Sequence, residues 1–233
     1  MEAVILAGGK GTRLYPFTTD IPKPLVPVGS RPIVEILLRR LQKAGVSRAH
    51  LAVSHLAEQV IKTLGNGQQL SLDIKYTIED TPLGTVGPLK LISALPEHFI
   101  VANGDVISDI NITDLYQYHL KSDSLLTIAV QKRTERIDYG VLQSDSTGRV
   151  ITFTEKPASE LFVSMGIYIF ARDILRYVPD GKPFGFDNLV LTLLEHRERV
   201  MSYPYSGFWL DIGRPDDYER AIREIDIIEQ MLK

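Results

Sequence analysis

The chain has 233 residues, a formal net charge of −3 and no cysteine. Its length allows one large α/β domain or two small ones. The near-neutral charge gives no reason to expect nucleic-acid or membrane binding, so any phosphate chemistry must come from a local basic site. The missing cysteines exclude disulfides, thiolate catalysis and cysteine-ligated zinc. The sequence has no apolar run of about 20 residues and no signal-peptide pattern, so we expect a cytoplasmic protein.

Strand and helix patterns alternate through the first hundred residues. Short apolar runs predict strands at 3–6, 49–53, 72–78 and 99–102. Apolar residues at helical spacing predict helices at 32–44, 56–64 and 86–95. This alternation predicts a Rossmann-like, mostly parallel sheet with helices on both faces.

The pattern changes after a predicted helix at 112–121. Strands are predicted at 125–130, 140–143, 150–154, 162–170 and 208–210, and helices at 186–195 and 215–231. No linker, repeat or low-complexity tract interrupts the chain. We therefore expect one domain, whose second half completes the sheet and closes over the ligand.

The stretch LAGGKGTRLYPFTTDIPKPL, residues 6–25, follows the first predicted strand. Glycines in this position let backbone N–H groups approach an anion, although a tight surface loop would use glycine too. The spacing fits neither the dinucleotide fingerprint nor the P-loop. Arg13 adds a cation, and Lys23 stands between Pro22 and Pro24, which restrict the backbone. The stretch therefore predicts a phosphate-binding loop.

Two aspartates follow predicted apolar strands. Asp105 comes after Gly104 and the strand at 99–102, and Asp211 ends the strand at 208–210. Open α/β sheets bind ligands at the carboxyl ends of their strands. Two carboxylates can supply the ligands that Mg²⁺ usually takes from protein, although either aspartate alone could be a helix cap or a loop residue.

The stretch at 6–25, the segments around Asp105 and Asp211 and four further motifs together resemble the sugar-1-phosphate nucleotidyltransferases, also called nucleotide-sugar pyrophosphorylases. The resemblance covers nearly the whole chain, in order, and is closest to the mannose-1-phosphate and heptose-1-phosphate guanylyltransferases. It implies the nucleotide-diphospho-sugar transferase fold, with a nucleotide-binding half at about 1–110 and a sugar-phosphate-binding half at about 111–233. The motifs are GGKGTRLYPFTTDIPKPLVPV, EDTPLGTVGPL, VANGDV, DYGV, EKP, SMGIYIF and GFWLDIGRPDDYERA.

The resemblance also implies a reaction. A phosphate oxygen of the sugar 1-phosphate attacks the α-phosphorus of a nucleoside triphosphate, and pyrophosphate leaves. The positions matching Asp105 and Asp211 hold catalytic Mg²⁺ in the family. Arg13 would neutralise the triphosphate, and Lys23 would reach toward the α-phosphate. The nucleotide-binding residues that the resemblance implies are Leu6, Ala7, Gly8, Gly9, Gly11, Thr12, Glu79, Pro82, Gly84 and Thr85.

The sugar-phosphate site is implied to comprise Gly140, Glu155, Lys156, Ser164 and Gly166. Lys156 would hold the phosphate, Glu155 would accept hydrogen bonds from sugar hydroxyls, and Gly140 would leave room for the ring. Ser164 departs from the family, which often has an asparagine there that contacts the sugar. The identity of the sugar therefore stays open.

The run at 79–87 is similar to the E-x-x-P-L-G-T-A-G run of the guanylyltransferases and favours GTP. The carboxylate of Glu79 is suited to accept from the N1–H and amino group of guanine. Uridylyl, thymidylyl or cytidylyl transfer to another sugar phosphate, and a non-catalytic nucleotide-sugar-binding subunit, are the alternatives. The helix predicted at 215–231 is apolar on more than one face, which fits packing on its own domain or a homo-oligomer contact.

Overall fold

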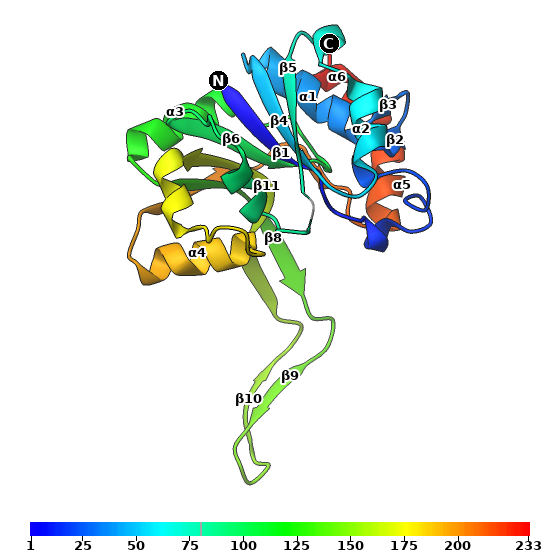
Figure 1. The fold of residues 1–233 in the computed structure, drawn as a ribbon. Coiled ribbons are helices and arrows are strands. Elements are labelled where there is room, and N and C mark those ends of the chain that lie inside the picture. Colours follow the sequence, from blue (N-terminus) through cyan, green and yellow to red (C-terminus); the bar gives the residue numbers. More distant parts are fainter. Residues whose placement is uncertain (80) are drawn as a thin grey trace.

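The computed structural model describes residues 1–79 and 81–233. Its main sheet has seven strands in the order β12-β8-β11-β6-β1-β4-β5 (Figure 1). Neighbouring strands are parallel except for β11, which is antiparallel to both β6 and β8. The mostly parallel α/β fold predicted from the sequence is confirmed. The strands are β1 (Glu2–Leu6), β4 (Arg48–Val53), β5 (Asp73–Ile78), β6 (His98–Asn103), β8 (Leu126–Arg136), β11 (Ala158–Ala171) and β12 (Val200–Tyr205).

Helices cover both faces of this sheet. Side chains alternate along each strand, so Ile5 of β1 packs with α1, α2 and α3, whereas Val4 packs with α4 on the other face. The last two helices, α5 and α6, pack with the first loop in a third cluster. The helices are α1 (Ile33–Lys43), α2 (Ala57–Leu64), α3 (Ile112–Ser122), α4 (Phe186–Glu195), α5 (Pro215–Arg223) and α6 (Ile225–Met231).

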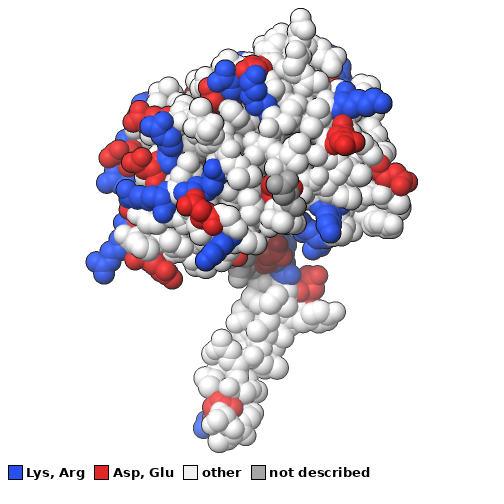
Figure 2. All heavy atoms as spheres, in the orientation of Figure 1, with Lys and Arg blue, Asp and Glu red and all other residues white. Residues whose placement is uncertain are grey.

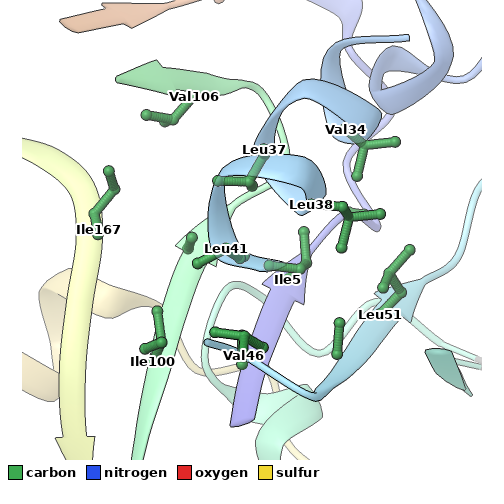
Figure 3. Close-up of a cluster of buried hydrophobic side chains, with 14 of the residues drawn as sticks. Ile5, Val34, Leu37, Leu38, Leu41, Val46, Leu51, Ile100, Val106 and Ile167 are labelled. Atoms are coloured by element: carbon green, nitrogen blue, oxygen red, sulfur yellow. The ribbon is translucent and has the colours of Figure 1, made fainter. Parts of the chain in front are cut away.

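The core is centred on α1 (Figure 3). Val34, Leu37, Leu38 and Leu41 repeat at the spacing of one helix face and are buried against the sheet. Truncating such a buried leucine lowers the free energy of unfolding by about 2–5 kcal/mol. This packing therefore fixes α1 against β1, β4 and β6. No helix among the described residues is both long and apolar enough to cross a membrane.

Two of the predicted helices differ in the structure. The helix predicted at 86–95 is only a 3₁₀ helix, η4 (Gly87–Leu91). Leu89 within it and the flanking residues Val86 and Ile92 are buried and repeat every third position, which fits a 3₁₀ turn better than an α-helix. The helix predicted at 215–231 is interrupted at Glu224 and forms α5 and α6. Both predictions of a single α-helix were wrong.

Two short strand pairs lie beside the main sheet. They are β7 (Val106–Ser108) with β13 (Trp209–Asp211), and β2 (Pro27–Val28) with β3 (Arg31–Pro32), both antiparallel. The first pair brings the segment after β6 next to the segment before α5, two parts of the chain that lie about a hundred residues apart.

A long hairpin projects from the body of the molecule (Figure 1). Strands β8 and β11 continue beyond the sheet, and β9 (Val141–Ser144) pairs with β10 (Val150–Thr154) at the outer end. We call residues 131–163 the arm. The second half of the chain thus completes the sheet as expected, but its hairpin points away from the body instead of closing over it.

Candidate active site

A cleft of about 400 Å³ opens at the carboxyl ends of β1, β4 and β6. All ten residues predicted to contact a nucleotide line it, together with Arg13, Lys23 and Asp105. Its walls also include Ser54 and Asn103, which directly follow or end β4 and β6 and were not predicted. A polar residue at the end of a buried parallel strand was the signal for both.

The glycine loop approaches Glu79 closely. A Cβ atom on Gly8 would lie 2.7 Å from Glu79 Oε1, so only glycine fits between the loop and this carboxyl group. Glu79 is 8% exposed, and its Oε2 accepts a hydrogen bond of 2.8 Å from the Leu83 N–H. Burial raises the pKa of Glu79, and the bond from Leu83 opposes that rise. Glu79 therefore fixes the loop at residue 83 with one oxygen and turns the other toward Gly8.

Lys23 lies beside Gly11 of the loop, since a Cβ on Gly11 would be 3.0 Å from Lys23 Cβ. It begins the 3₁₀ helix η2 (Lys23–Leu25), with Pro22 before it and Pro24 within the turn. Its Nζ donates a hydrogen bond to Asp105 Oδ2, and the two side chains are 12% and 19% exposed. The prolines and this ion pair together order the lysine inside the cleft.

The β7–β13 pairing sets Asp105 beside Asp211. Asp211 pairs with Val106, and the Ile212 N–H donates to the Asp105 carbonyl oxygen at 3.1 Å. Burial raises the pKa of Asp211, the charge of Asp105 raises it further, and Lys23 opposes both. Asp105 Oδ1 is buried without a hydrogen-bond partner in the described chain.

This pair of carboxylates fits a divalent cation. Two neighbouring like charges and an unpartnered buried oxygen are relieved by an ion that coordinates both groups. The described residues contain no group of three or more histidine, cysteine or acidic side chains placed to hold a metal. An ion here would complete its coordination with phosphate oxygens and water.

Two of the predicted sugar residues lie near the acidic pair. Ser164 Oγ hydrogen-bonds to Tyr168 Oη at 3.1 Å, and the pKa of Tyr168 is raised by burial and then by the charges of Asp211 and Asp105. Gly166 has a φ of +72°, and a Cβ there would lie 2.7 Å from the side-chain nitrogen of Asn103. Glycine at this position therefore lets Asn103 keep its place in the cleft wall.

The other three predicted sugar residues are on the arm and do not line the cleft. Gly140 lies under the ring of Phe153, since a Cβ at Gly140 would be 2.6 Å from that ring. Glu155 and Lys156 lie where the outer hairpin joins the rest of the arm, and Lys156 has a φ of +45°. The fold thus gathers the nucleotide and metal candidates but leaves three of the five sugar candidates on the arm, away from the cleft.

The glycine-rich loop, Arg13 and Lys23 lie at the carboxyl ends of parallel strands, with Asp105 after β6 and Asp211 at the end of the antiparallel strand β13. Sites of this kind in α/β proteins bind phosphate-bearing ligands. Residues 2–226 match the family model described as "Nucleotidyl transferase". The chain belongs to this nucleotidyl transferase family, and the family resemblance predicted from the motifs is confirmed.

Individual relatives narrow the comparison. The chain is 39% identical to the mannose-1-phosphate guanylyltransferase catalytic subunit beta of Drosophila pseudoobscura pseudoobscura, over 93% of this chain and 60% of that protein. It is 34% identical to the UTP–glucose-1-phosphate uridylyltransferase of Synechocystis sp., over 97% of this chain and 63% of that protein. The chain therefore spans about six tenths of the length of these curated relatives.

Among solved structures, HddC from Yersinia pseudotuberculosis has 31% sequence identity and a TM-score of 0.75, covering 96% of this chain and 99% of that one. The same protein complexed with GMP-PN has 30% identity and a TM-score of 0.74. The likeness extends over almost the full length of both chains.

Proposed function

We propose that this chain transfers guanylyl groups from GTP to a sugar 1-phosphate, of which mannose 1-phosphate or a heptose 1-phosphate is the best candidate. The observation that carries the proposal is that one cleft unites the glycine loop, Glu79, Arg13, Lys23 and Asp105. The similarity to a mannose-1-phosphate guanylyltransferase and to HddC, solved with GMP-PN, supports guanine as the base.

The reaction is a single displacement at phosphorus. An oxygen of the sugar phosphate forms a bond to the α-phosphorus of GTP, and the bond to the bridging oxygen of the β-phosphate breaks. Pyrophosphate leaves with the electron pair, and the anionic attacking group needs no general base. Catalysis then depends on positioning and on neutralising charge, which is the role of Arg13 and Lys23. Each charge-assisted hydrogen bond contributes about 1.5–3 kcal/mol.

We further propose that Asp105 and Asp211 hold Mg²⁺. When bound, the ion would neutralise phosphate oxygens of the triphosphate. Lys23 donates to Asp105 Oδ2 in the structure, leaving Oδ1 without a partner, so the aspartate can keep the lysine and still offer an oxygen to the metal. The neighbouring glycines, among them Gly8 and Gly9, supply backbone N–H groups to the phosphates.

Glu79 is the proposed reader of the base. It is the buried carboxyl group beside the loop, and one of its oxygens is already used by Leu83. A Glu79→Gln variant can keep the bond from Leu83 through its amide oxygen but replaces the other acceptor by a donor. Its kcat/KM should fall at least about tenfold with GTP, and less with UTP. An equal fall with both nucleotides would show that Glu79 does not read the base.

Uridylyl transfer is the second candidate, favoured by the similarity to the Synechocystis uridylyltransferase. Pyrophosphate release should be measured with GTP, UTP, dTTP, CTP and ATP, each against mannose, glucose, heptose, glucosamine and N-acetylated hexosamine 1-phosphates. One strong pair that is lost in an Asp105→Asn variant would establish transferase activity and its substrates. Absence of turnover with every pair, while nucleotide sugars still bind, would favour a non-catalytic binding subunit.

A further inference from the structure

Ser54 is a polar residue of the cleft wall without a role in the proposed reaction. It directly follows β4, lines the cleft and is partly exposed there. A serine shortly before a helix commonly caps that helix with its hydroxyl group. Here α2 begins at Ala57 and has no side-chain cap. The Ser54 hydroxyl is therefore not used by the helix that follows it, and it is available to a ligand in the cleft.

Ser54 and Glu79 directly follow two neighbouring strands. The parallel strands β4 and β5 stay in register to Val53 and Ile78, and the Glu79 N–H donates to the Val53 carbonyl oxygen at 3.1 Å. Gly8 of the glycine loop shows how near both side chains are. A Cβ on Gly8 would lie 3.4 Å from Ser54 Cβ and 2.7 Å from Glu79 Oε1. A hydroxyl group and a carboxyl group therefore border the same point of the loop.

The charges of the cleft determine which part of a nucleotide meets these two groups. Figure 2 shows acidic and basic side chains interspersed over the visible face of the body, so no broad field of one sign orients an anion from that face. The cations among the described lining residues are Arg13 and Lys23. Lys23 bonds to one member of the acidic pair, and a Cβ on Gly213 would lie 3.8 Å from Asp211 Oδ1 and 3.9 Å from Arg13 Nη2. Phosphates bind at this cationic end and are repelled by Glu79, which leaves the uncharged base for the other end.

The two side chains match one kind of base edge. An ionised carboxylate only accepts hydrogen bonds, so the base must turn an N–H group toward Glu79. Guanine, hypoxanthine, uracil and thymine have a ring N–H next to a ring carbonyl, which is the arrangement of a lactam. Adenine and cytosine instead have a bare ring nitrogen next to an amino group. The carbonyl oxygen of a lactam needs a donor, and the Ser54 hydroxyl can supply it.

Thr85 is the other residue with a hydroxyl group at this end of the cleft, and its oxygen is already engaged. Thr85 Oγ1 accepts a hydrogen bond of 3.1 Å from the Phe186 N–H at the start of α4. The N–H and the carbonyl oxygen of Phe184 also bond to the backbone of the loop that carries Thr85, at 2.8 and 3.0 Å. These contacts hold Thr85 toward α4. Ser54 is therefore the donor that is free to meet the base.

We propose that Ser54 and Glu79 together recognise the lactam edge of the base. The Ser54 hydroxyl donates a hydrogen bond to the ring carbonyl oxygen, which is O6 in guanine, and Glu79 accepts from the neighbouring N–H. This proposal rests on the function proposed above and names the class of base that the site takes. The amino group of guanine is a second donor to Glu79 and favours guanine over uracil. ATP and CTP are rejected because each would turn a bare ring nitrogen toward the carboxylate.

Inosine triphosphate (ITP) isolates the lactam edge from the amino group. Its base, hypoxanthine, lacks only the amino group of guanine, and it differs from adenine at the edge itself. The Kd of GTP, ITP and ATP for the wild-type chain should be measured by isothermal titration calorimetry in Mg²⁺. We expect ITP to bind within about tenfold of GTP and at least about tenfold more tightly than ATP. Equal affinities for ITP and ATP would overturn the proposal.

Sulfur in place of O6 tests the hydrogen bond from Ser54 itself. In 6-thio-GTP the ring carbonyl oxygen is replaced by sulfur, which is a weaker acceptor. The Kd of GTP and of 6-thio-GTP should be measured for wild type, Ser54→Ala and the matched control Thr85→Val, which also loses one hydroxyl group. We expect sulfur to weaken binding about tenfold in wild type and in Thr85→Val, but less than about twofold in Ser54→Ala. A change of fold or of cleft shape in Ser54→Ala would alter both affinities and not their ratio.

A sulfur effect as large in Ser54→Ala as in wild type, or one lost only in Thr85→Val, would overturn the assignment to Ser54. The two proposals fail separately, because binding is measured without turnover. A sulfur effect that only Ser54→Ala removes, without turnover on any nucleotide and sugar phosphate, would sustain the base contact and refute the transferase function. Turnover with GTP beside an unchanged sulfur effect in Ser54→Ala would sustain the function and refute the base contact.

Discussion

Replacing Lys23 by methionine removes one positive charge from the acidic pair and keeps the length of the side chain. Lys23 donates a hydrogen bond to Asp105, and the two side chains are 12% and 19% exposed. The charge of Lys23 also opposes the rise in the pKa of Asp211. The variant therefore leaves two neighbouring carboxyl groups in a partly buried site without the cation that holds them together.

The expected loss in the free energy of unfolding is about 2 kcal/mol near neutral pH in EDTA. An exposed ion pair contributes about 0–1 kcal/mol, whereas removing one partner of a fully buried pair costs about 3–5 kcal/mol. The burial of this pair lies between the two cases. In a chain of this size 1 kcal/mol changes Tm by about 2–4 °C, so Tm should fall by about 4–8 °C.

Thermal unfolding followed by circular dichroism in EDTA measures the effect. The matched control is the double variant Lys23→Met/Asp105→Asn, which also removes the charge left unpaired. It should recover most of the lost stability, so that the two substitutions are strongly non-additive. Equal Tm values for wild type and Lys23→Met would refute the reasoning, because the ion pair would then contribute nothing. Simple additivity in the double variant would refute it too.

Three further outcomes can be checked with single substitutions. Gly8→Ala should raise the KM for the nucleotide at least about tenfold in steady-state kinetics, and more than Gly9→Ala, because a Cβ at Gly8 meets Glu79 at 2.7 Å and one at Gly9 meets nothing within 4 Å. Asp211→Asn should abolish turnover yet raise Tm at neutral pH in EDTA, because burial and Asp105 raise the pKa of Asp211 and so disfavour its charged form in the folded chain. The gain in Tm should vanish below about pH 4, where the carboxyl group of wild-type Asp211 is neutral like the amide of the variant. Burial and then the charge of His98 lower the pKa of His119 from 6.5 to about 4. The free energy of unfolding of wild type, measured by urea titration, should therefore fall by up to about 3 kcal/mol from pH 6.5 to pH 4, and that of His119→Gln should fall by less. A flat profile in wild type would contradict that assignment.

The residues that line the glycine-loop side of the cleft could be predicted because most of them are local in the chain. The glycine loop, Arg13 and Lys23 all lie within twenty residues of the first strand, and Glu79 directly follows β5 of the same sheet. Parallel strands place their carboxyl ends along one edge of the sheet. The residues that follow these strands therefore lie near one another for many different loop conformations. Asp105 and Asp211 were predicted by the same reasoning, although strand β7, whose pairing with β13 brings them together, was not predicted.

The parts of the fold that were not predicted, strand β12 and the position of the arm, depend on tertiary contacts. Strand β12 was not predicted because Pro204 interrupts its pattern, and it is indeed an edge strand, where a proline is tolerated. The position of the arm could not be predicted at all. A strand pattern shows that 141–144 and 150–154 can pair, but not on which surface the pair comes to rest. Whether Lys156 reaches the cleft depends on that surface.

Tracing isotopically labelled oxygen atoms from the sugar phosphate into the products tests guanylyl transfer most directly. The best sugar 1-phosphate of the substrate grid should be prepared with oxygen-18 in its non-bridging phosphate positions and incubated with GTP, Mg²⁺ and the wild-type chain. Mass spectrometry of the products should find all of the label in a GDP-sugar and none in pyrophosphate, because the sugar phosphate attacks the α-phosphorus of GTP. Label in pyrophosphate, or no GDP-sugar from any sugar phosphate, would contradict the proposed function.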